Sequence, residues 1–282
     1  MAQMLAGALQ GKVLLVTGAA QGLGREIALM AASLGAEAIS ICDKNVDLGR
    51  MTALAIEEAG SRALFVECDV AEPEQIEKVV RRTKDAFMRI DGLVNCVGDT
   101  SRATLDETDV ALWDRLHAVN LRSHFLFTKD VSRVMRDQPF STGHPRGSIV
   151  NIASVQSHAG LTECMAYAVA KAGLVCLTKN NAAELGKHAI KVNAINVGWC
   201  VTDQENVLQT AKAGPDWVTA ADKSCPLGRI LRMADVARLV VFLLSDGAHV
   251  TGSVMDWHPE FINGNLGGVI GHAERVPQPS AE

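Results

Sequence analysis

The segment Lys12-Val-Leu-Leu-Val16 runs directly into the glycine-rich segment Thr17-Gly-Ala-Ala-Gln-Gly-Leu-Gly24. A short apolar run of this kind is typical of a strand that is buried on both faces, as in a parallel sheet. Residues 25–34 then predict a helix, because apolar side chains recur there at helical spacing (Ile27, Ala28, Ala31 and Ala32). Strand, glycine-rich turn and helix in this order predict an α/β protein.

The glycine-rich turn also indicates a binding function. Glycines let the backbone bend sharply and approach a diphosphate, whose charge the exposed amides and the dipole of the helix start would stabilise. The spacing is GxxxGxG, and tight packing of a strand against a helix would explain these glycines as well. The turn alone therefore leaves a dinucleotide site and a structural role open.

An acidic residue closes the second predicted strand, at residues 37–42. In a Rossmann-type unit, a carboxylate at the position of Asp43 binds the adenosine ribose hydroxyls and repels a 2′-phosphate, which favours NAD over NADP. Two alternatives remain open. Asp43 could cap the helix predicted at 46–59, and Lys44 could tolerate a phosphate.

Compact apolar runs continue to alternate with amphipathic segments. Strands are predicted at 62–67, 90–94, 148–152, 190–195 and 251–256, and helices at 74–87, 113–135, 162–185 and 235–244. We therefore expect one Rossmann-type domain over residues 1–282, with a doubly wound, mostly parallel seven-stranded sheet flanked by helices. Gly214-Pro215 interrupts a helical pattern, which predicts a substrate flap of short helices over about residues 199–224. A tail over about residues 257–282 predicts no packed element past about Gly271.

Composition narrows the functional classes. The chain has 282 residues, a formal net charge of −5 and 48% hydrophobic residues, so we expect a large core and neither a nucleic-acid nor an anionic-membrane partner. No uncharged apolar run is long enough to span a membrane, and the start lacks the basic residues of a secretory signal, which predicts a cytoplasmic protein. The seven cysteines have no CxxC spacing, so we expect buried thiols and neither disulfides nor a metal site.

Tyr167 and Lys171 form the candidate acid-base centre. They are four residues apart on a predicted helix, so both side chains rise from one face. A neighbouring ammonium would lower the pKa of the phenol towards working pH, and Ser154 would orient an alcohol by a hydrogen bond. The alternative is a half-buried ring beside a solvated lysine. The chain contains a single tyrosine, which argues against a packing role for it.

Six motifs appear in an order and spacing that resemble the short-chain dehydrogenase/reductase family over nearly the whole chain. They are Thr17-Gly-x-x-x-Gly-x-Gly24, Asn95-x-x-Gly98, Asn120, Ser154, Tyr167-x-x-x-Lys171 and Asn196-x-Gly198-x-x-x-Thr202. The chain departs from the family at Cys96-Val97, where Ala-Ala or a similar pair is usual, and at Val197, where a proline usually precedes the glycine. The second change removes a fixed φ angle, so the loop after Gly198 has more freedom.

The resemblance implies a role for each matching residue. Tyr167 would be the general acid-base, Lys171 would bind the nicotinamide ribose, Ser154 would hold the substrate oxygen and Asn120, otherwise an unremarked helical residue, would anchor a relay water. The cofactor would be NAD, bound by Tyr167 and Lys171 together with Gly18, Gln21, Gly22, Leu23, Gly24, Asp43, Asp69, Val70, Asn95, Gly98, Val197, Cys200 and Thr202. The family also implies a homo-oligomer, a tetramer, with the helices predicted at 113–135 and 162–185 at the interface.

The substrate must be inferred from the loops. Ser154 and Tyr167 would meet a polar rim made of Arg102, Gln156, His158, Trp199 and Glu205. Such a rim suits a small polyhydroxylated molecule, such as a sugar, a sugar acid (2-keto-3-deoxy acids included) or a polyol, and the chain resembles bacterial sugar and sugar-acid dehydrogenases of the family. The alternatives are an apolar substrate, either a hydroxysteroid or a 3-oxoacyl thioester, and an NAD-binding protein without catalysis.

Overall fold

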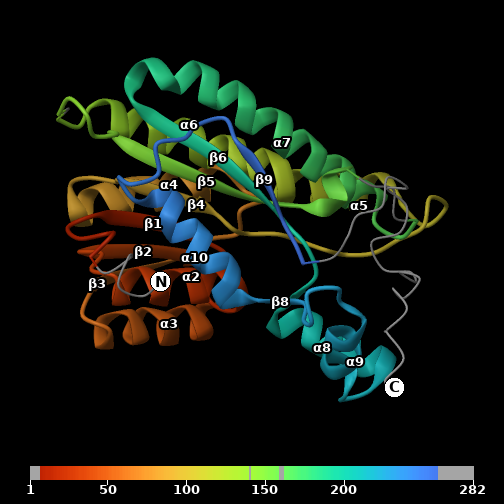
Figure 1. The fold of residues 1–282 in the computed structure, drawn as a ribbon. Helices are drawn as coiled ribbons and strands as arrows, with labels where there is room; N and C mark the ends of the chain where they lie inside the picture. The colour runs from red at the N-terminus through yellow and green to blue at the C-terminus, as the bar shows by residue number, and fades with distance from the viewer. Residues whose placement is uncertain (1–6, 140, 159–161, 260–282) are drawn as a thin grey trace.

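The first elements of the chain have the predicted order. The computed structural model describes residues 7–139, 141–158 and 162–259. Strand β1 (Val13–Thr17) is buried along its whole length, and helix α2 (Gly22–Ser33) begins inside the glycine-rich turn. Figure 1 shows α2 below β1, with β2 and β4 next to the strand.

The central sheet has seven strands in the order β3-β2-β1-β4-β5-β6-β9, and every neighbouring pair is parallel. This confirms the predicted doubly wound sheet. Besides β1, its strands are β2 (Ala38–Asp43), β3 (Arg62–Glu67), β4 (Gly92–Asn95), β5 (Gly147–Ser154), β6 (Ile190–Val197) and β9 (Val254–Trp257).

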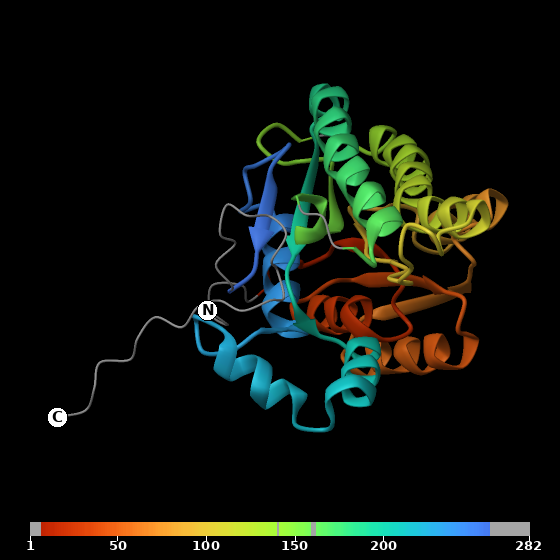
Figure 2. The ribbon, with the colours of Figure 1, turned by 90° about the vertical axis from the view of Figure 1, so that its right-hand side faces the viewer.

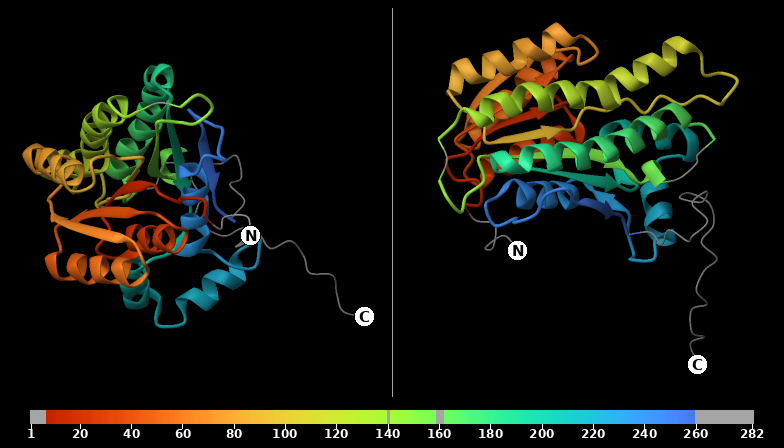
Figure 3. Two further views of the ribbon diagram at one scale, coloured as in Figure 1. Left: turned by 90° about the vertical axis from the view of Figure 1, so that its left-hand side faces the viewer. Right: turned by 90° about the horizontal axis from the view of Figure 1, so that it is seen from above.

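Helices cover both faces of the sheet, as Figure 1 and the view from above in Figure 3 show. Leu14 and Val16 of β1 pack in the cluster with α2, whereas Leu15 between them packs in the cluster on the opposite face. This alternation is the geometry of a strand buried on both sides. The first face is covered by α2, α3 (Val46–Glu58) and α10 (Met233–Leu244), and the second by α4 (Pro73–Phe87), α6 (Ser123–Arg136) and α7 (Met165–Leu185).

The prediction of one continuous helix over residues 113–135 is wrong. The structure has α5 (Val110–His117), a π-helical turn η1 (Ala118–Arg122) and then α6. The side chain of Asn120 lies in this turn and donates hydrogen bonds to the carbonyls of Leu116 and Asp99, at 3.0 and 2.9 Å. A π-helical turn inserts one residue into a helix, and periodicity does not reveal it.

The predicted flap is present as α8 (Asp203–Ala213) and α9 (Trp217–Ser224), which lie below the sheet in Figure 2. A small apolar cluster of its own holds it together, with Trp217 and Ile230 buried in it. A parallel two-residue ladder between β7 (Cys200–Val201) and β8 (Leu231–Arg232), which the sequence did not predict, joins the two ends of the flap. The remaining short turns are η2 (Val155–His158) and η3 (Gly186–His188).

The direction of the strand order reverses between β1 and β4. From β1 the chain builds outward to β2 and β3, and from β4 it builds outward on the other side. In open parallel sheets the crevice at such a switch point, outside the carboxyl ends of the strands, is where ligands bind.

None of the helices in the described ranges is long and apolar enough to cross a membrane. The prediction about the chain past Gly271 lies outside the described residues.

Candidate active site

A cleft of about 1230 Å³ opens at the carboxyl ends of the strands. It begins at the glycine-rich turn, passes the ends of β2, β4, β5 and β6, and is bordered by α8. A pocket for a single small molecule usually measures ~300 to 1000 Å³, so this cleft has room for a dinucleotide with a substrate beside it.

The glycine-rich turn fits a phosphate group. A Cβ on Gly24 would lie 2.3 Å from the carbonyl oxygen of Gly18, and one on Gly18 would lie 2.8 Å from the Cα of Val97. Only glycine permits this approach of the turn to α2 and to the end of β4. The N-cap residue Gln21 makes no side-chain capping bond, and the first turn of α2 holds no acidic residue, so no side chain of α2 itself neutralises the positive helix start.

Asp43 stands at the end of β2 with its carboxylate fixed in place. One oxygen accepts a hydrogen bond from the amide of Ala20 at 3.1 Å, and the other accepts one from the amide of Asn45 at 3.0 Å. The predicted capping role is taken by Asn45, whose side chain accepts from the amide of Leu48 at 3.1 Å. Asp43 therefore lines the adenosine end of the cleft as a preset negative charge, with Lys44 beside it.

Ser154, Tyr167 and Lys171 meet in the middle of the cleft. Ser154 is the last residue of β5, and α7 places Tyr167 and Lys171 one turn apart. The ammonium of Lys171 is buried and donates to the carbonyl of Ile152 at 2.8 Å. Its nitrogen lies 5.8 Å from the centroid of the Tyr167 ring. Strand β5 thus orients both the serine and the lysine.

The pKa of Tyr167 lies above its ordinary value, and not below it as predicted. Burial raises the pKa of Tyr167 to about 12, and the Ser154 hydroxyl, which acts in the opposite direction, does not offset it. Burial also lowers the pKa of Lys171 to about 8. The phenol is consequently a proton donor at neutral pH, and it must be deprotonated before it can act as a base.

Asn120 is not among the residues that line the cleft, and its role as the anchor of a relay water stays a prediction. The side chain is fully buried, and its amide oxygen accepts from the amide of Asp99 at 3.1 Å. With its two N–H groups bound to Asp99 and Leu116, the side chain is saturated by protein groups. Asn120 therefore shapes the loop after β4, which forms one wall of the cleft.

Two further predicted residues also lie outside the cleft lining. Asn95 is buried beneath the cleft, where its amide donates to Asn151 at 2.8 Å and so ties β4 to β5. His158 leaves with the turn η2 towards β9, and its Nε2 lies 2.8 Å from a carboxylate oxygen of Asp256 and 2.8 Å from the amide nitrogen of Asn196. Its ring is thus engaged by residues at the strand ends and does not line the cleft, so the substrate contact stays a prediction. The remaining predicted cofactor residues do line the cleft: Gly18, Gln21, Gly22, Leu23, Gly24, Asp43, Asp69, Val70, Gly98, Tyr167, Lys171, Val197, Cys200 and Thr202.

Arg102, Gln156, Trp199 and Glu205 border the substrate end of the cleft, as predicted. Glu205 has a supporting function, because it accepts a hydrogen bond from the indole nitrogen of Trp199 at 2.8 Å and one from Gln209 at 2.8 Å. Trp199 also packs against Trp217, with a ring-centroid distance of 5.7 Å. The indole is thereby held in one orientation above the cleft.

Sequence reasoning missed several lining residues. Three of them share one face of α8, where a spacing of four residues places Gln204, Leu208 and Lys212 towards the cleft. That spacing could have indicated from the sequence that the three residues share one face of a helix. The other missed lining residues include Cys96, Asp99, Glu163, Cys164 and Asp203.

The seven cysteines are all thiols, and they differ in burial. All seven are free, and five are buried, whereas Cys176 is exposed, unlike the buried thiols we expected. Burial raises the pKa of Cys96 and that of Cys200 to about 12, so these two thiols beside the cleft stay protonated. The described part of the chain contains no group of three or more His, Cys, Asp or Glu side chains that could hold a metal ion.

Comparison with known proteins agrees with this geometry. Residues 18–257 match a family model described as enoyl-(acyl carrier protein) reductase. An uncharacterised oxidoreductase of Thermotoga maritima is 32% identical over 251 residues, which cover 88% of this chain and 96% of that protein. A 3-oxoacyl-[acyl-carrier-protein] reductase of Synechocystis is 32% identical, with the same coverage of both chains. The solved structure of a candidate gluconate dehydrogenase from Agrobacterium tumefaciens superposes with a TM-score of 0.79 at 29% identity, covering 88% of this chain and 95% of that one.

The chain belongs to the short-chain dehydrogenase/reductase family of oxidoreductases. Its fold, its glycine-rich turn and its Ser154–Tyr167–Lys171 centre are the features that define this membership.

Tyr167→Phe tests the acid-base centre. Removing the phenolic oxygen should lower turnover by about 100- to 10,000-fold, the usual contribution of a general acid-base, and leave the Kd of the cofactor nearly unchanged. The pH dependence of the wild-type enzyme gives a second test of the same centre. Alcohol oxidation should accelerate as pH rises, because burial holds the Tyr167 pKa at about 12 and only the phenolate accepts a proton. The rise should weaken above pH 8, where Lys171, with its pKa lowered to about 8, loses its charge. Steady-state rates across pH and calorimetric cofactor titration measure both effects, and equal turnover in the variant would contradict the assignment.

Proposed function

We propose that the protein is an NAD-dependent dehydrogenase that interconverts a secondary alcohol, or a hemiacetal, and a carbonyl on a small polyhydroxylated substrate such as a sugar, a sugar acid or a polyol. One observation carries the substrate class. The side-chain oxygen of Gln156, a residue that lines the cleft two positions after Ser154, is buried and has no hydrogen-bond partner among the described residues.

An unpaired buried acceptor is costly, by ~1 to 3 kcal/mol, and a substrate that donates a hydrogen bond removes that cost. A hydroxyl next to the reacting carbon would be such a donor. Gln156 stands beside Ser154, which would orient the reacting oxygen, and the backbone amide of Gln156 donates to the Ser154 hydroxyl oxygen at 3.2 Å. A steroid or an acyl chain would leave the oxygen unpaired. Charged side chains of Arg102, Glu163 and Lys212 at the same end of the cleft also favour a hydrophilic substrate.

The known proteins lend support to both candidate substrate classes. The Agrobacterium tumefaciens structure favours a sugar acid, and the Synechocystis reductase favours an acyl thioester. The sequence identities to these two proteins are similar and do not discriminate between the substrate classes. We prefer the sugar-acid class because the unpaired side-chain oxygen of Gln156 needs a hydrogen-bond donor.

The residues of the chain would share the reaction in the following way. The nicotinamide, when bound, accepts the hydride from the carbinol carbon or returns it. Ser154 holds the substrate oxygen, and Tyr167 takes its proton during oxidation or gives one during reduction. Lys171, anchored on the carbonyl of Ile152, supplies positive charge that stabilises the phenolate once it forms.

NAD is the proposed cofactor because of Asp43. Its carboxylate is held by the amides of Ala20 and Asn45 and cannot turn away from a 2′-phosphate without losing both hydrogen bonds. Lys44 lines the same end of the cleft but has no comparable anchor in the described structure.

Asp43→Ala tests the cofactor preference. The wild type should use NAD at least about tenfold more efficiently than NADP, because two like charges about 4 Å apart repel by ~1 to 4 kcal/mol in a partly solvated site. The variant should lose most of that ratio, chiefly by improved use of NADP. Values of kcat/KM for both cofactors measure it. Comparable efficiencies in the wild type would mean that Lys44 offsets Asp43.

Gln156→Leu tests the substrate class. On polyhydroxylated substrates the variant should raise KM about five- to tenfold, the equivalent of one hydrogen bond, while kcat changes less. On an apolar ketone the variant should perform as well as the wild type or better. A screen of aldoses, polyols, aldonic acids and 2-keto-3-deoxy acids beside hydroxysteroids and 3-hydroxyacyl thioesters provides the substrates. Best wild-type activity on the apolar set would overturn the proposal.

We further propose that the protein is a homotetramer. The helices α5, α6 and α7 border a groove of about 780 Å³ lined by Leu121, Phe125 and Leu177 among others, and Phe125 remains 44% exposed. Two further apolar side chains are exposed elsewhere, Phe242 on α10 at 42% and Trp257 on the edge strand β9 at 38%. A tetramer with three two-fold axes requires a second self-complementary surface besides the groove, and each of these residues offers a place for it.

Phe125→Asp tests the first surface. A buried charge at a subunit interface should reduce the assembly from a tetramer of four 30.0 kDa chains to a smaller species in light scattering. Leu54→Asp is the matched control, because Leu54 is 60% exposed on α3, away from both surfaces, and should leave the tetramer intact. A monomeric wild type at micromolar concentration would refute the proposal.

A further inference from the structure

The flap is attached to the glycine-rich turn by a hydrogen bond that neither the fold nor the catalytic centre requires. A carboxylate oxygen of Asp203, the first residue of α8, accepts from the backbone amide of Gly22 at 2.9 Å. The two residues are 181 positions apart in the sequence, and both line the cleft.

The amide that Asp203 occupies belongs to an anion site. Gly22 is the first residue of α2, and the amides of a first helical turn have no partner within their own helix. The capping position, Gln21, does not supply one through its side chain, and no acidic residue of α2 lies in that turn. The carboxylate of Asp203 therefore serves as the anion at a helix start that is otherwise available to a phosphate.

We propose that Asp203 competes with the pyrophosphate of the dinucleotide for this helix start, so that the flap must release the glycine-rich turn when the cofactor binds. The proposal rests on the dinucleotide cofactor proposed above. A carboxylate and a pyrophosphate at one set of amides repel each other, and the two anions share a single positive helix end.

The construction of the flap allows such a release. Helix α8 has no buried residue, so moving it exposes little apolar surface. The apolar cluster of the flap is centred on α9, through Trp217 and Ala221, and does not depend on the contact with Gly22. Because α8 also carries Leu208 and Lys212 along the substrate end of the cleft, its movement would reshape the substrate site when the cofactor enters.

Two variants separate the effect of the negative charge of Asp203 from that of its hydrogen bond with Gly22. Asp203→Asn keeps an acceptor oxygen in the same place but removes the negative charge, and Asp203→Ala removes both. Each should bind NAD about three- to fivefold more tightly than the wild type in calorimetric titration at low salt, the effect of one nearby, solvent-exposed like charge. The gain should shrink in about 0.5 M KCl, because salt screens exposed charges.

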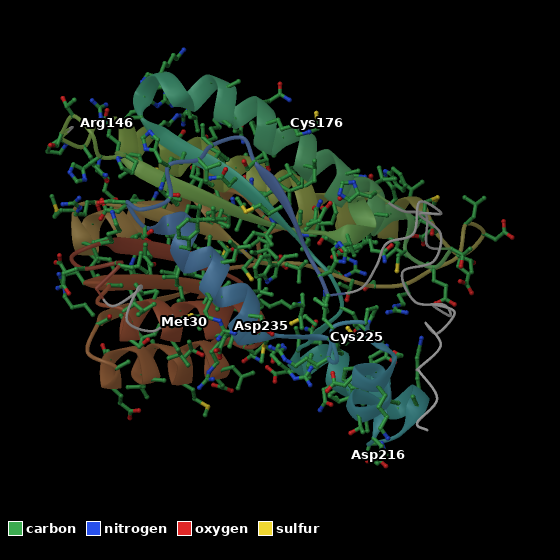
Figure 4. The ribbon with its side chains drawn as sticks, viewed as in Figure 1. Met30, Arg146, Cys176, Asp216, Cys225 and Asp235 are labelled. Atoms are coloured by element: carbon green, nitrogen blue, oxygen red, sulfur yellow. The ribbon has the colours of Figure 1, made fainter. Side chains whose placement is uncertain are left out.

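Asp216→Asn is the matched control. It removes the same charge from the same flap, but Asp216 precedes α9, makes no side-chain capping bond and lies at the outer end of the flap in Figure 4, so the Kd should not change. If Asp203→Asn binds NAD no more tightly than the wild type, competition is refuted, and weaker binding would identify the contact as a clasp that closes over the cofactor. If the wild type binds neither NAD nor NADP, the proposed function itself fails. Circular dichroism tests whether each variant is folded. If Asp203→Ala does not fold, the NAD affinity of Asp203→Asn alone decides the test.

Discussion

The close approach of the glycine-rich turn to its surroundings is the constraint on which the rest of the structure depends. Gly24 faces the carbonyl of Gly18, and Gly18 faces the backbone of Val97, at distances that no Cβ allows. This contact fixes α2 on β1 and brings the end of β4 beside the turn. The switch point of the sheet, the positive helix start and the floor of the cleft therefore arise from one packing requirement.

The parts of the structure that periodicity and spacing encode were predictable. The sequence predicted the seven strands, because strands buried on both faces appear as apolar runs. It also predicted the flanking helices and the meeting of Ser154, Tyr167 and Lys171, because a helix repeats every 3.6 residues. The π-helical turn at Asn120 and the ladder between β7 and β8 were not predicted. A π-helical turn keeps the helical pattern on both sides of it, and a two-residue ladder is too short to carry a pattern.

Residue type alone also misjudged positions that depend on partners distant in sequence. His158 was assigned to the substrate as one of the polar loop residues around the pocket, but its ring is bound by Asp256 on β9 and Asn196 on β6 and does not line the cleft. Asn95 matched a cofactor motif, yet it joins two strands beneath the cleft through Asn151. Conversely, Lys212 was not assigned to the site from the sequence, and α8 places it along the cleft.

The electrostatics of the centre show how burial governs the direction of proton transfer. The same desolvation that raises the pKa of Tyr167 to about 12 lowers that of Lys171 to about 8, so both side chains are driven towards their neutral forms. A neutral phenol favours donating a proton to a carbonyl, whereas oxidation of an alcohol needs the charged pair of phenolate and ammonium. Anything that brings polar groups or charge to this part of the cleft stabilises the pair. The polar rim of Gln156, Arg102 and Lys212 is therefore relevant to the chemistry as well as to substrate choice, because a hydrophilic substrate keeps the centre in a medium where the charged pair can form.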